Sequence, residues 1–163
     1  MKQIYGDLSM LNGAHEAGIC SLQIVPKEWI QTFPDAAHAT GSITTAITLK
    51  AGYAWLNLNL NPDTATFTEK PKQVKGLPFF DVNISGALND LTAAQRQQIE
   101  TIRYHELVCI YKDAKGRKRV TGNRETGLIA SFDFINTNKS DGLLEVGVEL
   151  GMQQAQLSPY YTA

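Results

Sequence analysis

The sequence predicts a mainly β fold of the α+β class: an antiparallel β-sandwich or barrel with one flanking α-helix. Apolar and polar residues alternate along several runs, and a period of two places successive side chains on opposite faces of a strand. Glycine-marked turns separate these runs, and only residues 92–104 have the start signal and glycine-free length of a helix. The 163 residues, 1–163, are expected to form a single domain.

The N-terminal part predicts one strand and one arm. Residues 19–25 have the composition of a strand that Pro26 closes, and Trp29 is expected to anchor the segment that follows. Residues 1–18 are rich in Gly, Ala and small polar groups, so we expect an arm that becomes ordered on assembly.

The next segment predicts two strands and a corner. Residues 43–50 alternate before the Ala51-Gly52 turn, which indicates the first strand. Residues 54–61 place Ala and Leu on one face and Asn on the other, so the second strand is expected to have one aliphatic and one polar face. Asn61-Pro62-Asp63 is expected to end this strand.

Residues 64–86 predict short strands separated by a connection. A short run at 64–68 is followed by residues 71–78, which have a proline at each end and are expected to be a connection. Phe80, Val82 and Ile84 alternate with polar residues and predict another strand, which is expected to end before Gly86.

The helix is predicted by its start. Thr92 and Gln95 have the spacing of a capping box, in which the two side chains satisfy each other's backbone amides. Residues 93–104 contain neither Gly nor Pro, and Ile99 and Ile102 give only a narrow apolar stripe. This pattern is typical of a surface helix that lies on a sheet.

A central hairpin is expected after the helix. Residues 106–112 carry apolar side chains on both faces, which indicates a strand that is buried on both sides. Residues 113–116 form a turn in which Gly116 can take a positive φ, and the chain returns through residues 117–121.

Two further strands complete the fold. A corner at 122–127 leads to a strand at 128–135, and residues 136–142 are expected to be a polar loop. The strand at 143–150 has one aliphatic and one wet face, and Gly147 and Gly151 suggest bulges or a bend.

Composition excludes several classes of protein. A hydrophobic share of 43% and a formal net charge of -1 exclude an acidic disordered tail and a globally basic nucleic-acid binder. No apolar run approaches the roughly 20 residues that span a bilayer, and residues 1–18 lack the pattern of a secretory signal. Cys20 and Cys109 are each expected to be a small buried apolar residue, although a bridge between them stays open.

The residues that could carry chemistry have simpler explanations. The pairs His15-Glu16 and His105-Glu106 lack the second His of a helical zinc site, and His38 stands alone. The glycines at 116 and 122 lack a phosphate-loop ending, the loop at 136–142 has a single carboxylate, and no serine has a nucleophile-elbow setting. We therefore expect a protein that is not an enzyme and has no catalytic residues, no cofactor and no metal.

A basic cluster stands out from this background. Six of the fifteen Lys and Arg residues fall between positions 112 and 124, around one predicted hairpin. Three interpretations are open: a solvated tip that discourages edge-to-edge aggregation, a contact with an acidic patch on a neighbouring subunit, and nucleic-acid recognition, which ranks last because the tip has no aromatic residues. The cluster consists of Lys112, Lys115, Arg117, Lys118, Arg119 and Arg124.

The order of elements over residues 43–161 resembles the small structural proteins of tail or neck modules in bacteriophages and prophages, especially those of Bacteroides-type hosts. The resemblance concerns element order and turn chemistry, and no invariant motif carries it. Residues 1–40 do not take part in it. It is carried by Trp55 to Asn61 running into Pro62-Asp63-Thr64, Gly76-Leu77-Pro78-Phe79-Phe80, the helix at 92–104, Leu107 to Asp113 with its turn, Gly122 to Leu128, and the closing Ser158-Pro159-Tyr160-Tyr161.

This resemblance implies a tail-tube-like fold whose subunits form rings that stack into a conduit for DNA. It implies a homo-oligomer in the virion tail or neck, made in the bacterial cytoplasm, whose partners are copies of itself, other tail or neck proteins, and passing DNA that it does not read by sequence. Glu145 and Glu149 are then candidates for lumen-facing repellents, and the basic cluster is a candidate inter-subunit contact.

The main alternative is a small β-barrel that binds a ligand or protein partner. Such a protein needs a cavity lined by the apolar faces of its strands. Large side chains on those faces are expected to fill this space instead, namely Phe80, Tyr111, Phe132 and Phe134.

Overall fold

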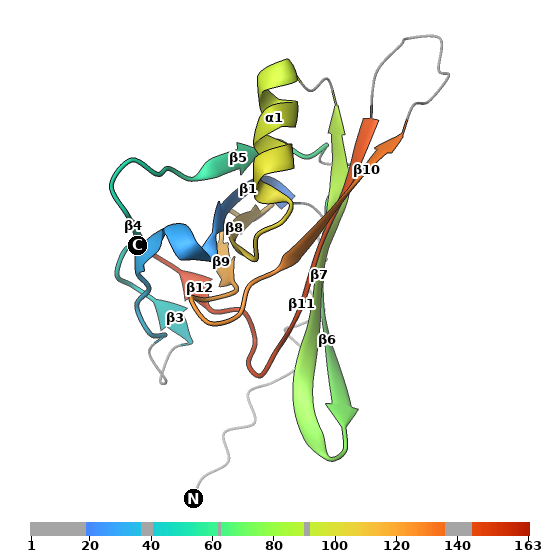
Figure 1. The fold of residues 1–163 in the computed structure, drawn as a ribbon. Helices are drawn as coiled ribbons and strands as arrows, with labels where there is room; N and C mark the ends of the chain where they lie inside the picture. The colour runs from blue at the N-terminus through green and yellow to red at the C-terminus, as the bar shows by residue number, and fades with distance from the viewer. Residues whose placement is uncertain (1–18, 37–40, 62, 90–91, 136–144) are drawn as a thin grey trace, which may run out of the picture.

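The structure is a computed structural model that describes residues 19–36, 41–61, 63–89, 92–135 and 145–163. Within these residues the chain is mainly β, as predicted, with one α-helix (Figure 1). The elements are β1 (Ile19–Pro26), a 3-10 turn (Lys27–Trp29), β2 (Ile30–Thr32), β3 (Ser42–Ile43), β4 (Thr48–Leu49), β5 (Leu56–Leu58), β6 (Thr66–Val74), β7 (Leu77–Asn89), α1 (Ala93–Ile102), β8 (Leu107–Asp113), β9 (Lys118–Thr121), β10 (Ile129–Ile135), β11 (Glu145–Gln154) and β12 (Tyr160–Tyr161).

Two sheets pack face to face as a β-sandwich. The six-stranded sheet has the order β3-β12-β9-β8-β1-β5, and the four-stranded sheet has the order β10-β11-β7-β6. The main core lies between them, where Phe67 of β6 stacks on Tyr111 of β8 with ring centroids 4.2 Å apart. The expected sandwich with a flanking helix is therefore confirmed.

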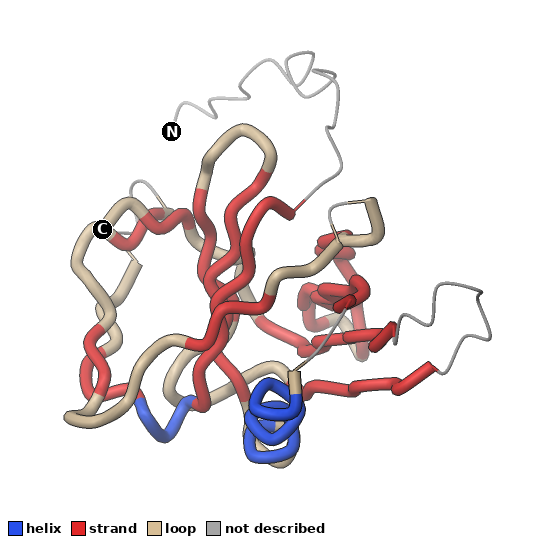
Figure 2. Tube along the Cα trace, turned by 90° about the horizontal axis from the view of Figure 1, so that it is seen from above, coloured by secondary structure: helices blue, strands red, loops and turns tan. Residues whose placement is uncertain are grey.

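The helix closes one end of this sandwich. Its predicted capping box is present, since the Thr92 hydroxyl accepts from the Gln95 amide and the Gln95 side chain accepts from the Thr92 amide. Ile99 and Ile102 are the two buried residues of the helix and pack into the main core. Figure 2 shows α1 viewed down its axis, beside strands of both sheets.

The outer face of the six-stranded sheet is also covered. Val108 and Ile110 of β8 point into a second apolar cluster, which includes Ile30 of β2 and Ile47. Leu107, Cys109 and Tyr111 point into the main core, so five consecutive residues of β8 are buried. This arrangement confirms the predicted central strand, and β8 indeed lies between β9 and β1.

Two predicted strands in the first half are much shorter than expected. The run 43–50 contains only β3 and β4, because the chain between them turns and the Ile47 amide donates to the Tyr161 hydroxyl. The run 54–61 contains only β5, because Asn61 at its end caps a turn by accepting from the Thr64 and Ala65 amides. The expected faces are nonetheless present, with Leu58 buried and Asn57 exposed.

The predicted connection at 71–78 is wrong. These residues form the end of β6, a two-residue turn and the start of β7, in a continuous antiparallel register from Val74 opposite Leu77 to Thr66 opposite Ser85. Pro71 is tolerated because β6 is an edge strand and its missing amide costs no ladder hydrogen bond. The strand predicted to end before Gly86 also continues through it to Asn89.

The bulges predicted at Gly147 and Gly151 are also absent. β11 pairs residue by residue with both β10 and β7, and no register shift occurs at either glycine. Cys109 is a buried free cysteine, as expected, whereas the side chain of Cys20 lies outside what the structure describes. Trp29 stacks on Tyr53 with ring centroids 4.5 Å apart, which fits its expected anchoring role. The arm at 1–18 and the loop at 136–142 lie outside the described residues.

Candidate functional site

The most prominent surface feature is the hairpin of β6 and β7. Its turn consists of Lys75 at φ 50° and Gly76 at φ 82°, so both central residues are left-handed, as in a type I′ turn. This turn suits a two-residue hairpin because its twist matches that of the flanking strands. The sequence signal for this hairpin was a pair of strand-like runs separated by Lys75-Gly76. Pro71 and Pro78, one on each side of the turn, obscured it.

The end of this hairpin reaches beyond the rest of the four-stranded sheet (Figure 1). β11 pairs with β7 only as far as Phe80, opposite Gln154, so Leu77 to Phe79 have β6 as their only strand neighbour. Val74 and Leu77 lie opposite each other at the tip and are 55% and 73% exposed. The hairpin therefore carries an uncovered pair of apolar side chains at its end.

A polar network holds the base of this hairpin against the other sheet. Glu69 of β6 has a nearly buried side chain, and its Oε1 accepts from the Ser158 amide at 2.8 Å and from Gln154 Nε2 at 3.1 Å. Its Oε2 accepts from Arg119 Nη1 of β9 at 3.3 Å. Ser158 in turn hydrogen-bonds the buried Thr121 hydroxyl at 2.8 Å. The Glu69 carboxylate thus joins the two sheets.

Arg119 is the centre of an aromatic contact in the same region. Its guanidinium lies 4.6 Å from the centroid of the Tyr160 ring, and its Nη2 donates to the Tyr160 hydroxyl at 3.0 Å. The neighbouring Tyr111 is buried, and this desolvation raises the pKa of its hydroxyl well above the usual value. The sequence did not reveal this network, because the strand that contains Glu69 was expected to end one residue earlier, at residue 68.

The structure divides the predicted basic cluster. Lys112, Lys115, Arg117 and Lys118 surround the tip of the β8–β9 hairpin and are exposed. Arg119 instead turns toward Glu69 and Tyr160. Arg124 lies in the corner at 122–127, which follows the opposite end of β9. Four of the six residues therefore form one surface, which we call the basic tip.

The basic tip is held in shape by Asp113. Its carboxylate accepts from the Lys115 and Arg117 amides at 2.9 Å each and from Arg117 Nε at 2.8 Å. Partial burial works against the charged form of Asp113, but these hydrogen bonds outweigh it and hold the pKa below the ordinary value. Gly116 has the positive φ expected of it, 79°.

Glu149 lies on the outer face of the four-stranded sheet. Val148 and Leu150 on either side of it are buried, whereas Glu149 is exposed and accepts a hydrogen bond from Asn83 Nδ2. The backbone of Glu145 pairs with Ile135 and Asn89 in the same strand. The predicted wet face of this strand is therefore confirmed, while its position in a lumen stays a prediction.

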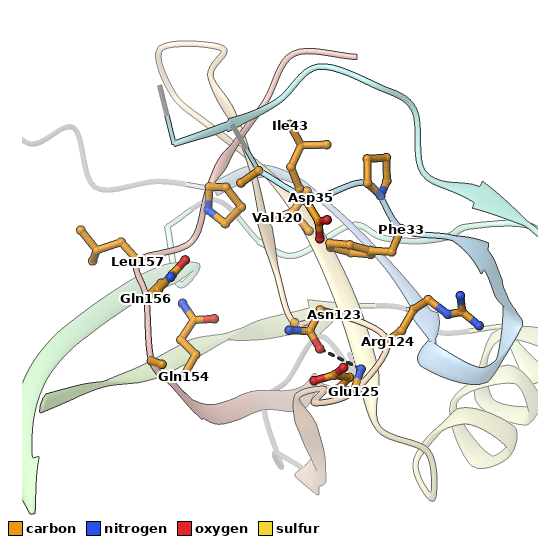
Figure 3. Close-up of a pocket in the computed structure, with 15 residues that line it drawn as sticks. Phe33, Asp35, Ile43, Val120, Asn123, Arg124, Glu125, Gln154, Gln156 and Leu157 are labelled. Atoms are coloured by element: carbon orange, nitrogen blue, oxygen red, sulfur yellow. Dashed lines mark hydrogen bonds between the residues drawn. The ribbon is translucent and has the colours of Figure 1, made fainter. Parts of the chain in front are cut away.

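A solvent-open cleft of about 470 Å³ lies where the end of β9, the segment between β11 and β12, and the segment after β2 meet. Figure 3 shows Gln154, Gln156 and Leu157 on one wall and Phe33 and Asp35 on another. The Asn123 side chain accepts from the Glu125 and Thr126 amides and so belongs to its own turn. The residues that line the cleft include no serine, cysteine or histidine.

The other residues considered for acid/base or metal chemistry bond to different partners. Nδ1 of His105 lies 3.5 Å from Glu28, whereas Glu106 pairs with Lys27, so His105 and Glu106 do not converge. No group of three His, Cys, Asp or Glu side chains within the described ranges is arranged to hold a metal. His15, Glu16 and His38 lie outside those ranges.

In the part of the chain that the structure describes, no helix has the length and apolar character needed to cross a bilayer. Comparisons of the chain with protein-family models, with curated proteins and with solved structures found no match.

Proposed function

We propose that this chain is a non-enzymatic structural protein of a bacteriophage or prophage virion. In this proposal it is a tail-tube or neck-ring subunit that assembles with copies of itself into a conduit for DNA. The resemblance over residues 43–161 supports the virion context, and the sandwich with one flanking helix is the fold that this resemblance implies. Other tail or neck proteins and passing DNA are the further partners.

The observation that carries the proposal is the uncovered tip of the β6–β7 hairpin. Two opposed aliphatic side chains, Val74 and Leu77, lie more than half exposed at the end of a long and well-paired hairpin. Among the described strands, residues 77–79 pair only with β6, so this extension adds little to the packing of one copy. An apolar tip on a rigid element is instead typical of an anchor that a partner covers.

The free edge of β6 indicates how the hairpin engages its partner. Pro71 cannot donate to an added strand, and the neighbouring Lys70 and Lys72 place charges along the same edge. These features discourage uncontrolled strand addition. We therefore infer that association uses the side chains of the tip and not an extension of the sheet.

The proposal is tested by the mass and shape of the assembled protein. Light scattering after size exclusion, followed by negative-stain microscopy, is expected to show rings or tubes for the wild-type chain. Val74→Asp/Leu77→Asp is expected to weaken association at least tenfold, since it places two charges where apolar cover is needed.

Leu157→Asp is the matched control, because Leu157 is 56% exposed and lies outside β6 and β7, in the segment before β12. It is expected to assemble like the wild-type chain. A wild-type protein that stays monomeric at every concentration contradicts the proposal, as does a hairpin variant that assembles normally.

A further inference from the structure

Two glycines in β11 have no explanation within the residues that the structure describes. Gly147 and Gly151 lie in the middle of the four-stranded sheet, and neither has a positive φ. A Cβ added at Gly147 would lie 3.7 Å from the Asp133 Cβ, and one added at Gly151 would lie 3.9 Å from the Val82 carbonyl oxygen. These are ordinary contacts, so neither backbone conformation nor crowding requires glycine.

Other glycines of the chain show the contrast. A Cβ at Gly86 would lie 3.0 Å from Leu60 Cδ1, and one at Gly127 would lie 2.9 Å from backbone atoms of Leu107. At those positions the fold itself excludes a side chain. A glycine within a strand costs roughly 0.5–1 kcal/mol relative to alanine, so two glycines without an internal reason indicate close approach of another backbone.

The surface around these glycines is acidic. Gly147, Glu149 and Gly151 share the outer face of β11, because the residues between them are buried. Asp133 of β10 lies opposite Gly147 on the same face and is exposed. Two carboxylates thus stand beside the two glycines, on a face that also carries Ile129, which lies opposite Gly151 and is 70% exposed. We call this surface, formed by Asp133, Gly147, Glu149 and Gly151, the acidic strip.

The basic tip has the complementary properties. Lys112 and Lys118 lie directly opposite each other, and like charges in this position destabilise a hairpin. Within the described residues, Lys112, Lys115 and Lys118 have no ion-pair partner. Ala114 and Gly116 make the turn itself narrow. A partner with negative charge and a bare backbone would relieve the repulsion and accept this shape.

We propose that the basic tip of one copy docks on the acidic strip of a second copy. The two surfaces lie on different sheets of the molecule, so the contact is heterologous and repeats from copy to copy, closing a ring or extending a filament. The inference rests on the proposed self-assembly and names the contact that drives it. It assigns Glu149 to this interface and not to a lumen.

A pair of charge reversals tests the contact. Lys112→Glu/Lys118→Glu reverses the charge of the opposed pair in the tip and keeps the two residues like-charged, so the stability of the monomer should be preserved. Asp133→Lys/Glu149→Lys reverses the strip at two exposed positions. In sedimentation equilibrium each variant alone is expected to associate at least tenfold more weakly than the wild-type chain, and an equimolar mixture of the two is expected to recover association.

A second variant separates the interface from folding. Gly147→Ala/Gly151→Ala is expected to unfold at the same or higher urea concentration than the wild-type chain, because both Cβ atoms have room. The same variant is expected to associate more weakly, because the added methyl groups stand in the path of the docking backbone. Lys50→Glu and Asp63→Lys are exposed charge reversals outside both surfaces and serve as controls.

The outcomes distinguish the contact from the proposed function. A wild-type chain that assembles while both reversed variants assemble equally well overturns the docking contact and leaves the structural role intact. A wild-type chain that never associates overturns both. If the reversed tip associates normally but loses binding to a 30-base-pair DNA duplex that the wild-type chain binds, the tip is a nucleic-acid surface and the docking contact is wrong.

Discussion

The two large sheets of the molecule use strands of similar composition in different ways. In the six-stranded sheet, β8 is buried on both faces because a second apolar cluster covers the outer side. In the four-stranded sheet, β11 is buried on one face only, and its outer side carries Glu149 between two glycines. The difference shows that, within the described residues, β8 is packed on both faces, whereas β11 leaves its outer face open to solvent.

The largest expected difference between the sheets concerns a single charge. Ile110→Lys places an ammonium group in the second apolar cluster, where the residue is 5% exposed, and is expected to cost several kcal/mol or to unfold the protein. Glu149→Lys on the outer face of β11 is expected to change the free energy of unfolding by less than about 0.5 kcal/mol. Urea denaturation followed by circular dichroism measures both, and equal losses would contradict the comparison.

A smaller effect is expected where the two sheets are joined. Glu69→Gln removes the charge that Arg119 faces and weakens the acceptor of the Ser158 amide. We expect a loss of about 2 kcal/mol, since hydrogen bonds to charged groups contribute roughly 1.5–3 kcal/mol. Glu100→Gln is a suitable control because its ion pair with Arg103 is exposed. A loss as small as that of the control would remove Glu69 from its joining role.

The cap of the helix at the end of the sandwich is expected to contribute less to the free energy of unfolding. Thr92→Ala removes the hydroxyl that accepts from the Gln95 amide and is expected to cost about 1 kcal/mol. Thr101→Ala, which removes only a hydroxyl that donates to the Gln97 carbonyl, is expected to cost less. Thermal unfolding of the two variants gives the ranking, and the reverse order would show that the cap does not hold this end closed.

The smallest expected effect is a pH dependence of stability at the tip of the β8–β9 hairpin. The folded pKa of Asp113 is lowered, so its stabilisation is present above the unfolded pKa of about 3.9 and is lost as the pH falls through the folded pKa. Asp113→Asn is therefore expected to be less stable than the wild-type chain at neutral pH and to approach it near pH 2. Urea midpoints at both pH values measure this change, and a constant difference would contradict it.

The sequence predicted regular features well where local chemistry decides them. The capping box of Thr92, the turn at Gly116 and the two-sided burial of residues 107–111 all follow from patterns a few residues long, and all are confirmed. The strand through Pro71 was missed because its acceptability depends on β6 being an edge, which no local pattern reveals. Whether a strand tolerates a proline at such a position depends on which strands pair across long distances in the sequence.

The candidate surfaces show the same difference between features set by local sequence and features set by long-range contacts. The exposed lysines of the basic tip were recognised because they are close in sequence. The turn of Arg119 toward Glu69, 50 positions away, could not be anticipated, and neither could the separation of Arg124 from the tip. The glycines of β11 were noticed but explained as bulges or a bend, because only the structure shows that their register is regular and their surroundings are open.

Hydrogen exchange measured at low and high protein concentration tests the central claim most directly. If a second copy covers the four-stranded sheet and its hairpin, amides in peptides spanning residues 70–80 should exchange more slowly as the concentration rises. Peptides spanning residues 107–111 of β8, already buried within one chain and outside the basic tip, should not change. Identical exchange of residues 70–80 at every concentration would show that the hairpin tip stays uncovered and would contradict the account.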